Sequence, residues 1–284
     1  MDEHIQLILQ PEISDSAFSE LRRKLVKERG LDLNGYKDRC IRRRIAVRLR
    51  AMQCSSLEGY LKILLEDPQE LDRLIQAVTI NVSGFFRNQE TFELIRERIL
   101  PSIIAWRNAN GEKELNIWSA GCATGEEVYS LAIMLRQYFR GAVHSMRVFI
   151  VATDINESFL ARARQGIYSH ERLEAVPPSL RKRYFREREG SLELIPRIRE
   201  MVSFEKQDLF EPCPFRQMDL ILCRNVLIYL SRMVQEKIFR GFHEALRPEG
   251  FLVLGKTESL LEPVQYGFRS ILPRERAYQK VALS

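Results

Sequence analysis

The sequence has little cysteine, no CxxC spacing and no long apolar run. Its five cysteines are odd in number and widely scattered among 284 residues, so neither a disulfide framework nor a zinc site is indicated. Apolar stretches such as Val148 to Ala152 are far too short to span a bilayer. The N-terminal segment MDEHIQLILQPE carries acids where a signal peptide carries bases. We therefore expect a soluble protein of the reducing cytoplasm, with no bound metal and no membrane insertion.

Positive charge is concentrated in one segment. The chain holds 44 Lys and Arg against 38 Asp and Glu, a net charge of +6, and such an excess points to an acidic partner. Residues 37–50 contain seven bases and one acid, so this segment alone carries +6. On a helical wheel Ile41 and Ile45 share one face, whereas Arg39, Arg43 and Arg50 fall nearly opposite. The stripe is either a solvated face or a docking surface for an acidic partner, and no aromatic residues interleave it as a nucleic-acid stacking platform requires.

Two segments of different periodicity follow one another along the chain. From about residue 14 to 75 apolar residues recur at helical spacing. After Asn110-Gly111 short apolar runs alternate with helical stretches, which is typical of β-α-β units and a parallel sheet. The pattern predicts strands at 115–120, 147–153, 218–223 and 251–254, and helices at 126–137 and 231–246. We expect a helical domain over 1–78, with a basic helix at about 36–52, and an α/β domain over 79–284.

A small antiparallel insertion is expected inside the α/β domain. The Glu189-Gly190 pair, between two strand-like runs, predicts a hairpin. The run MVSFEKQ that follows is expected to add a third antiparallel strand. The predicted insertion covers about 184–207.

A glycine-containing turn follows the first predicted strand. Gly121 and Gly125 lie between LNIWSA and a helix, at the carboxyl end of a parallel strand, where open α/β sheets bind ligands. An ordinary strand-to-helix turn explains the glycines equally well. Glu126 and Glu127 at the helix start disfavour a pyrophosphate, because two carboxylates would face it. A nucleoside ligand with a positive group and no phosphate, such as S-adenosylmethionine, fits this turn better.

Polar residues follow three further strands of the predicted sheet. Asp154 closes the run VFIVATD, where it is placed either to accept hydrogen bonds from ribose hydroxyls or to cap the next helix. Asp208 follows the apolar run near 202, and Asn225 follows MDLIL. Each is either a ligand contact, reading an adenine edge for example, or a loop cap.

Five segments of the sequence resemble the CheR family, the chemotaxis receptor methyltransferases. They occur in matching order: NVSGFFRNQETF (81–92), IWSAGCATGEEVYSLAI (117–133), ATDINESFLARARQGIY (152–168), LCRNVLIYLSRMVQEKIF (222–239) and PEGFLVLGKTESL (248–260). The resemblance runs from the helical part almost to the C-terminus. It implies a Rossmann-like methyltransferase sheet with the β insertion and an all-α N-terminal domain. It also implies methyl esterification of glutamates on bacterial chemoreceptors with S-adenosyl-L-methionine, leaving S-adenosyl-L-homocysteine.

The resemblance also implies roles for individual residues. Arg87 and Tyr229 match the family residues nearest the reacting groups. The implied cofactor contacts are Asn81, Ser83, Arg87, Ala120, Glu126, Asp154, Asp208, Leu209, Arg224 and Asn225. From the residues alone, a surface ion pair is the favoured interpretation of Arg87, which follows two phenylalanines, and packing is the favoured interpretation of Tyr229 at a strand-to-helix junction.

The implied chemistry is consistent with the residues present. A glutamate is ionised at pH 7 and needs no general base, and none of the four histidines lies in the motif segments. Catalysis then depends on orientation and partial desolvation, an effect worth up to about 7 to 11 kcal/mol in well-aligned systems. Arg87 is expected to orient the incoming carboxylate, and Tyr229 to hold the substrate or the polar end of the cofactor.

The resemblance favours one of the possible partners. It favours docking of Arg39, Arg43 and Arg50 on the acidic cytoplasmic helices of a chemoreceptor over nucleic acid, and it assigns the β insertion a role with a C-terminal receptor peptide in some members. A monomer is expected. Two alternatives stay open, a nucleic-acid methyltransferase and a scaffold that binds S-adenosylmethionine without turnover.

Overall fold

The computed structural model describes residues 11–79 and 83–281 of the chain. These residues form two compact units. The first is Met1–Asn81 together with Tyr229–Val234, and the second is Val82–Ile228 together with Gln235–Ser284. Asn81, one of the implied cofactor contacts, lies outside the described residues.

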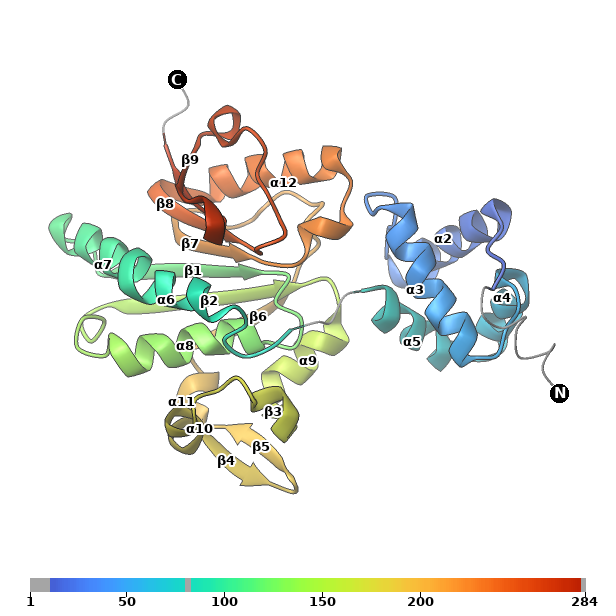
Figure 1. Cartoon of the computed structure of the whole chain (residues 1–284), viewed down its shortest axis with the longest axis horizontal. Helices are drawn as coiled ribbons and strands as arrows, with labels where there is room; N and C mark the ends of the chain where they lie inside the picture. Colours follow the sequence, from blue (N-terminus) through green and yellow to red (C-terminus); the bar gives the residue numbers. More distant parts are fainter. Residues whose placement is uncertain (1–10, 80–82, 282–284) are drawn as a thin grey trace. The chain divides into compact units, whose positions relative to one another are not determined.

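The first unit is all-helical in the described part of Met1–Asn81. Its helices are α2 (Asp15–Arg29), α3 (Asp38–Ala51), α4 (Leu57–Glu66) and α5 (Pro68–Val78) (Figure 1). Several boundaries have a local cause: Ser14 caps α2, Gly30 ends it at φ +66°, and Asp67 caps α5 directly before a proline. The core is formed by the apolar stripes that the periodicity indicates, from Phe18, Leu21, Leu25, Ile41, Ile45, Leu49, Tyr60 and Leu64.

The arginines of α3 divide into two groups. Arg42, Arg44 and Arg48 are held within the unit, by the carbonyl of Ile13 at 2.8 Å, the carbonyl of Ala77 at 3.0 Å and the carboxylate of Glu70 at 2.5 Å respectively. Arg39, Arg43 and Arg50 are exposed, and so is Val47 between them. The basic segment is therefore partly structural, and its exposed part is a narrow stripe along one helix face.

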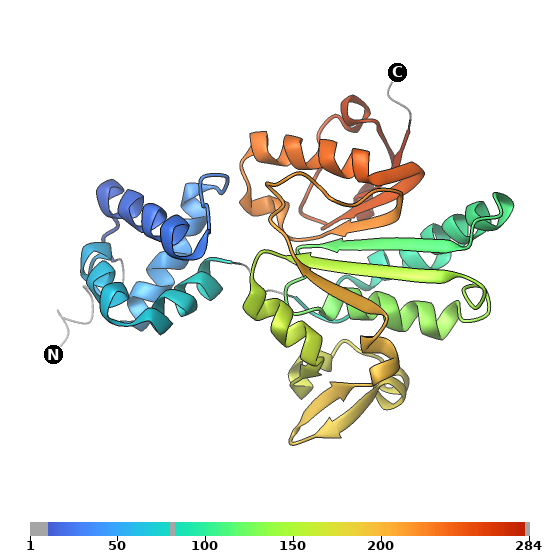
Figure 2. The same ribbon diagram turned by 180° about the vertical axis from the view of Figure 1, so that it is seen from behind.

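The second unit is built on a seven-stranded sheet (Figures 1 and 2). The strand order is β6-β2-β1-β7-β8-β10-β9, in which the first five strands are parallel and β10 is antiparallel to both neighbours. The strands are β1 (Glu114–Ala120), β2 (Arg147–Asp154), β6 (Val202–Lys206), β7 (Met218–Cys223), β8 (Leu246–Leu254), β9 (Phe268–Leu272) and β10 (Ala277–Lys280). The carboxyl ends of β1 and β2 lie together, since Ala120 pairs opposite Thr153.

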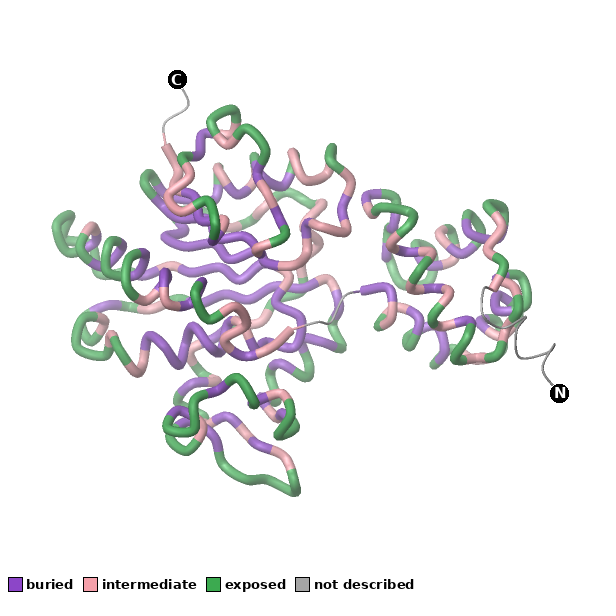
Figure 3. The backbone as a smooth tube through the Cα atoms, in the orientation of Figure 1, coloured by how far each residue is buried: buried purple, intermediate pink, exposed green. Residues whose placement is uncertain are grey.

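Helices pack against this sheet. The helix containing α6 (Gln89–Leu94), the π-helical turn η2 (Ile95–Ile99) and α7 (Leu100–Ala109) reaches β1, while α8 (Glu126–Tyr138) and α9 (Glu157–Gln165) contact β2 and β6. The remaining helices are α10 (Pro178–Tyr184), α11 (Pro196–Arg199) and α12 (Arg232–Ala245), with short turns η3 (His170–Leu173), η4 (Leu227–Tyr229), η5 (Pro263–Tyr266) and η6 (Pro273–Glu275). Figure 3 shows the central strands buried along most of their length. No helix in residues 11–79 or 83–281 is long and apolar enough to cross a membrane.

The small insertion is a three-stranded antiparallel sheet of order β3-β5-β4, and one strand differs from the prediction. Its strands are β3 (Ile167–Tyr168), β4 (Phe185–Arg188) and β5 (Ser191–Leu194). The run MVSFEKQ, expected to be its third strand, instead forms β6 and pairs parallel with β2, so that prediction is wrong. The cause is α11, which begins at Pro196 and separates β5 from β6. The fold class itself, a mainly parallel α/β sheet with an antiparallel insertion and an all-α N-terminal part, is confirmed.

Candidate functional site

The glycine turn after β1 is forced by close packing. Gly121 has φ +76°, and a Cβ there would lie 2.5 Å from Cγ2 of Val226. The amides of Gly121 and Cys122 both donate to the carbonyl of Thr153, at 2.8 and 2.9 Å. The turn is therefore tied to the end of β2 and to the loop after β7, at the carboxyl edge of the sheet, and any side chain at position 121 would push these segments apart.

Asp154 is buried beside this turn. Its Oδ2 accepts a hydrogen bond from the amide of Ala123 at 2.9 Å, and its Oδ1 accepts one from the amide of Asn156 at 2.9 Å. Burial raises the pKa of the carboxyl to about 6, although both backbone hydrogen bonds act in the opposite direction. The cap of α9 is the side chain of Asn156, which accepts from the amide of Ser158 at 2.9 Å. The capping interpretation of Asp154 is therefore wrong, and its carboxylate faces the glycine turn.

Two acids occupy the start of α8, each paired with an arginine. Glu126 is buried and accepts hydrogen bonds from the hydroxyl of Thr124 at 2.8 Å and from Nη1 of Arg172 at 3.1 Å. The same Nη1 donates to the carbonyl of Ser83 at 2.9 Å. Glu127 accepts from Nη1 of Arg224 at 2.9 Å. The helix dipole favours both carboxylates, and the arginines connect them to other segments of the site.

Arg224 holds the Arg87 loop in place. Its side chain is almost fully buried, and Nη2 donates to the carbonyl of Arg87 and to Oδ1 of Asn88, both at 2.8 Å. Nη1 donates to the carboxylate of Glu127. The guanidinium implied as a cofactor contact is thus used for internal contacts through both Nη atoms. Arg87 itself is half-buried in the loop that Arg224 fixes.

Glu258 fixes the loop after β7. Its buried carboxylate accepts four backbone hydrogen bonds, from the amides of Asn225 at 2.8 Å, Val226 at 2.9 Å, Leu227 at 2.7 Å and Gly255 at 2.6 Å. Asn225 has φ +63°, an unusual conformation that these bonds stabilise. Burial raises the pKa of Glu258, and the four amides counteract this. Sequence reasoning assigned this residue no role, although it lies in the segment GKTESL that carries the family resemblance.

Asp208 and Leu209 follow β6 at the same edge. Both are half-buried, and Oδ1 of Asp208 accepts from the amide of Phe210 at 2.9 Å. The amide of Gln207 donates to the carbonyl of Asp154 at 3.1 Å, which ties this loop to the end of β2. The α/β unit therefore joins most of the implied cofactor residues in one network, which contains Ser83, Arg87, Ala120, Glu126, Asp154, Asp208, Arg224 and Asn225.

Tyr229 is not part of the α/β unit that contains this network. It belongs to the segment grouped with the helical unit, where the guanidinium of Arg44 lies 5.1 Å from the centre of its ring. Its carbonyl accepts from the amide of Lys37 at 2.8 Å. The catalytic role that the resemblance implies for Tyr229 therefore stays a prediction.

The network suits a nucleoside ligand that carries no phosphate. Arg172 and Arg224 are each paired with a carboxylate at the start of α8, so neither is an unpaired cation for a phosphate to bind. Asp154 supplies carboxylate oxygens, and Cys122 and Cys223 are buried thiols whose pKa values are raised well above the ordinary value by burial. No group of acids, histidines and cysteines in the described residues has the spacing of a metal site. S-adenosylmethionine, with its ammonium and sulfonium, fits this donor set.

Comparison with known proteins identifies both units. Residues 81–271 match the family model of the CheR methyltransferase SAM binding domain, and residues 16–79 match that of the CheR methyltransferase all-alpha domain. A chemotaxis protein methyltransferase of Listeria innocua is 32% identical over 88% of this chain and 92% of its own length. One of Salmonella typhimurium is 33% identical over 90% of this chain and 88% of its own. The predicted cofactor, S-adenosylmethionine, is confirmed by the first of these domains.

Other similarities are more limited. An uncharacterized 104.1 kDa protein of Rhodobacter capsulatus is 34% identical over 86% of this chain, which spans only 25% of that protein. Among solved structures, a complex of DhpI with SAH overlaps 68% of this chain and 74% of its own, with a TM-score of 0.33 and 15% identity.

The raised pKa of Asp154 predicts a pH dependence of cofactor binding. Ribose hydroxyls donate to a carboxylate, so the ionised form binds better, and that form is lost as the pH falls through about 6. We expect affinity for S-adenosylhomocysteine to be constant above pH 7 and to weaken about tenfold per pH unit well below 6. Calorimetric titrations from pH 5 to 8 measure this. In Asp154→Asn binding should be weak and free of this dependence; an unchanged pH profile in the variant would contradict the assignment.

Loss of the Glu258 carboxylate should disturb the Asn225 loop. Glu258→Gln puts an amide group among four backbone N–H donors, and a buried donor without a partner costs about 1 to 3 kcal/mol. We expect S-adenosylhomocysteine to bind at least about tenfold more weakly in a protein that circular dichroism shows to be folded. Glu262→Gln, at an exposed acid of the following loop, is the matched control. Equal affinity in both variants would show that Glu258 does not position the site.

Proposed function

Because this chain belongs to the CheR methyltransferase family, we propose that it methylates glutamate side chains of bacterial chemoreceptors with S-adenosylmethionine and so takes part in chemotaxis adaptation. The observation that carries the proposal is the match of both family domains, in order, to the two units. The structure supports the proposal as well, because the network around Glu126, Glu127 and Asp154 offers carboxylates and no unpaired arginine, and so disfavours a ligand that carries phosphate.

The residues of the network suit a reaction that needs no proton transfer. When bound, S-adenosylmethionine supplies an electrophilic methyl group on a cationic sulfur. A glutamate carboxylate is ionised at pH 7, and the network of hydrogen bonds around Glu126, Asp154 and Glu258 includes no histidine. Arg87, held by Arg224 through its carbonyl at 2.8 Å, is proposed to orient the incoming carboxylate. The chain then contributes orientation and partial desolvation of the charged reactants.

The product of the reaction tests this proposal. A carboxyl methyl ester is hydrolysed by alkali, whereas N-methyl groups on protein or nucleic acid are stable. Incubation with labelled cofactor and receptor-containing membranes should give label on protein that alkali releases as methanol. Alkali-stable label on RNA or DNA would support the nucleic-acid methyltransferase alternative instead. Tight cofactor binding without any transfer would support the non-catalytic scaffold.

The exposed stripe of α3 is proposed to dock on the receptor. Arg39, Arg43 and Arg50 are exposed, whereas Arg42, Arg44 and Arg48 are held inside the helical unit. The stripe follows one helix face over twelve residues, from Arg39 to Arg50, and such a row of positive charges is complementary to an acidic receptor helix. A cytoplasmic location and a monomeric state accompany this proposal.

Removal of the stripe should separate docking from cofactor binding. Arg39→Ala, Arg43→Ala and Arg50→Ala together should lower receptor methylation at least about tenfold, mainly through a higher KM for the receptor. Affinity for S-adenosylhomocysteine should not change. The control removes the same charge from exposed positions of the same unit, Arg23→Ala, Lys27→Ala and Lys62→Ala. If both triple variants lose activity equally, net charge and not the stripe is responsible.

The β insertion offers a further proposed contact. Among the described residues β4 pairs only with β5, so its other edge is an open strand edge. An extended peptide can add to such an edge by main-chain hydrogen bonds. The C-terminal segment of a receptor is the proposed peptide.

A further inference from the structure

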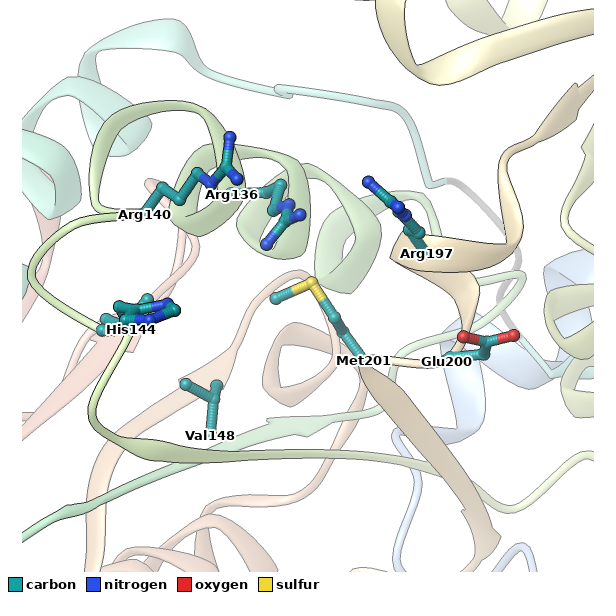
Figure 4. A pocket seen from close by; sticks show the side chains of 8 residues that line it. Arg136, Arg140, His144, Val148, Arg197, Glu200 and Met201 are labelled. Atoms are coloured by element: carbon teal, nitrogen blue, oxygen red, sulfur yellow. The ribbon is translucent and has the colours of Figure 1, made fainter.

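A second basic site lies in the α/β unit, away from the network described above. It is a pocket of about 350 Å³ lined by residues of α8, of the loop after it, of β2, and of the turn from α11 to β6. Figure 4 shows Arg136 and Arg197 extending toward it from two different elements, with His144, Val148 and Met201 around the space between. Arg140 lies two residues beyond the end of α8 and lines the same pocket.

The three arginines of this pocket have no acidic partner among residues 11–79 and 83–281. In the part of the chain that the structure describes, none of Arg136, Arg140 and Arg197 forms a salt bridge. Neighbouring arginines do: Arg199 pairs with Glu193 at 3.1 Å. The pocket wall contains a single acid, Glu200, so the charge of its lining is positive even with His144 neutral. The lining thus holds three guanidinium groups and one carboxylate, and an anionic ligand would offset the excess positive charge.

The pocket is distinct from the cofactor network. Val148 is the second residue of β2, and Met201 directly precedes β6. These positions lie at the amino ends of parallel strands, whereas Asp154 and Asp208 lie at the carboxyl ends of the same two strands. A ligand held here therefore does not occupy the cofactor network.

We propose that this pocket binds a small phosphate ester of the size of a nucleoside monophosphate. Arginine binds phosphate through charged and often bidentate hydrogen bonds, which assigns the phosphate to Arg136, Arg140 and Arg197. Val148, Val143 and Met201 give the pocket an apolar wall, against which a planar base packs, and a thioether is a favourable contact for such a ring. A volume of about 350 Å³ is within the range of small-molecule sites.

Calorimetric titration with AMP and GMP tests the proposal. The titrations are made with saturating S-adenosylhomocysteine present, so that the cofactor network is filled. We expect both nucleotides to bind, and inorganic phosphate and adenosine to bind at least about tenfold more weakly, because each lacks one half of the ligand. Arg136→Gln with Arg197→Gln should weaken nucleotide binding at least about tenfold.

The control replaces two exposed arginines of the same unit that lie outside the pocket, Arg98→Gln and Arg240→Gln, and should bind both nucleotides as the unmodified chain does. Three results would overturn the proposal. These are no binding of either nucleotide, equal binding to both double variants, and binding of inorganic phosphate as tight as that of the nucleotides. Retained affinity of the pocket variant for S-adenosylhomocysteine shows that it is folded.

Discussion

Two arginine–carboxylate pairs at the start of α8 hold the functional edge of the sheet together. Arg224 joins Glu127 to the Arg87 loop, and Arg172 joins Glu126 to Ser83. The segments they connect are far apart in sequence. Breaking the buried Arg224–Glu127 pair should cost about 3 to 5 kcal/mol because a charge is left without a partner, whereas the pair of Arg172, whose side chain is 35% exposed, contributes less. These pairs therefore fix the loops and also neutralise the arginines that would otherwise attract phosphate.

The sheet and most of the site could be predicted from the sequence, because buried parallel strands appear as continuous apolar runs. The predicted run 218–223 is β7, and polar residues directly after such runs fall at one edge. Asp154 was found in this way. The prediction that failed was the pairing of β6. This strand follows a hairpin in the sequence and was expected to join it, but it pairs with β2 in the large sheet. The partner of a strand depends on where the preceding segment, here α11, directs the chain. The alternation of apolar and polar residues identifies a strand but does not identify its partner.

The residues that position the site could not be predicted. Glu258 contacts amides about thirty residues earlier in the chain, and Arg172 contacts Glu126 across 46 positions. A lone acid or arginine outside an element carries no local signal for such contacts. The basic segment 37–50 shows the same limit. Its seven bases cannot be distinguished in the sequence, and only the structure shows that Arg42, Arg44 and Arg48 bind groups within the helical unit.

We infer that Arg172 and Arg224 hold the site together through the two carboxylates at the start of α8, and that the carboxylate of Asp154 binds the cofactor. A crystal structure of the protein with S-adenosylhomocysteine tests this most directly. We expect ribose hydroxyls hydrogen-bonded to the carboxylate of Asp154, with the Arg224–Glu127 and Arg172–Glu126 pairs intact. A ligand carboxylate that displaces Glu127 from Arg224, or a ribose that makes no contact with Asp154, would contradict it.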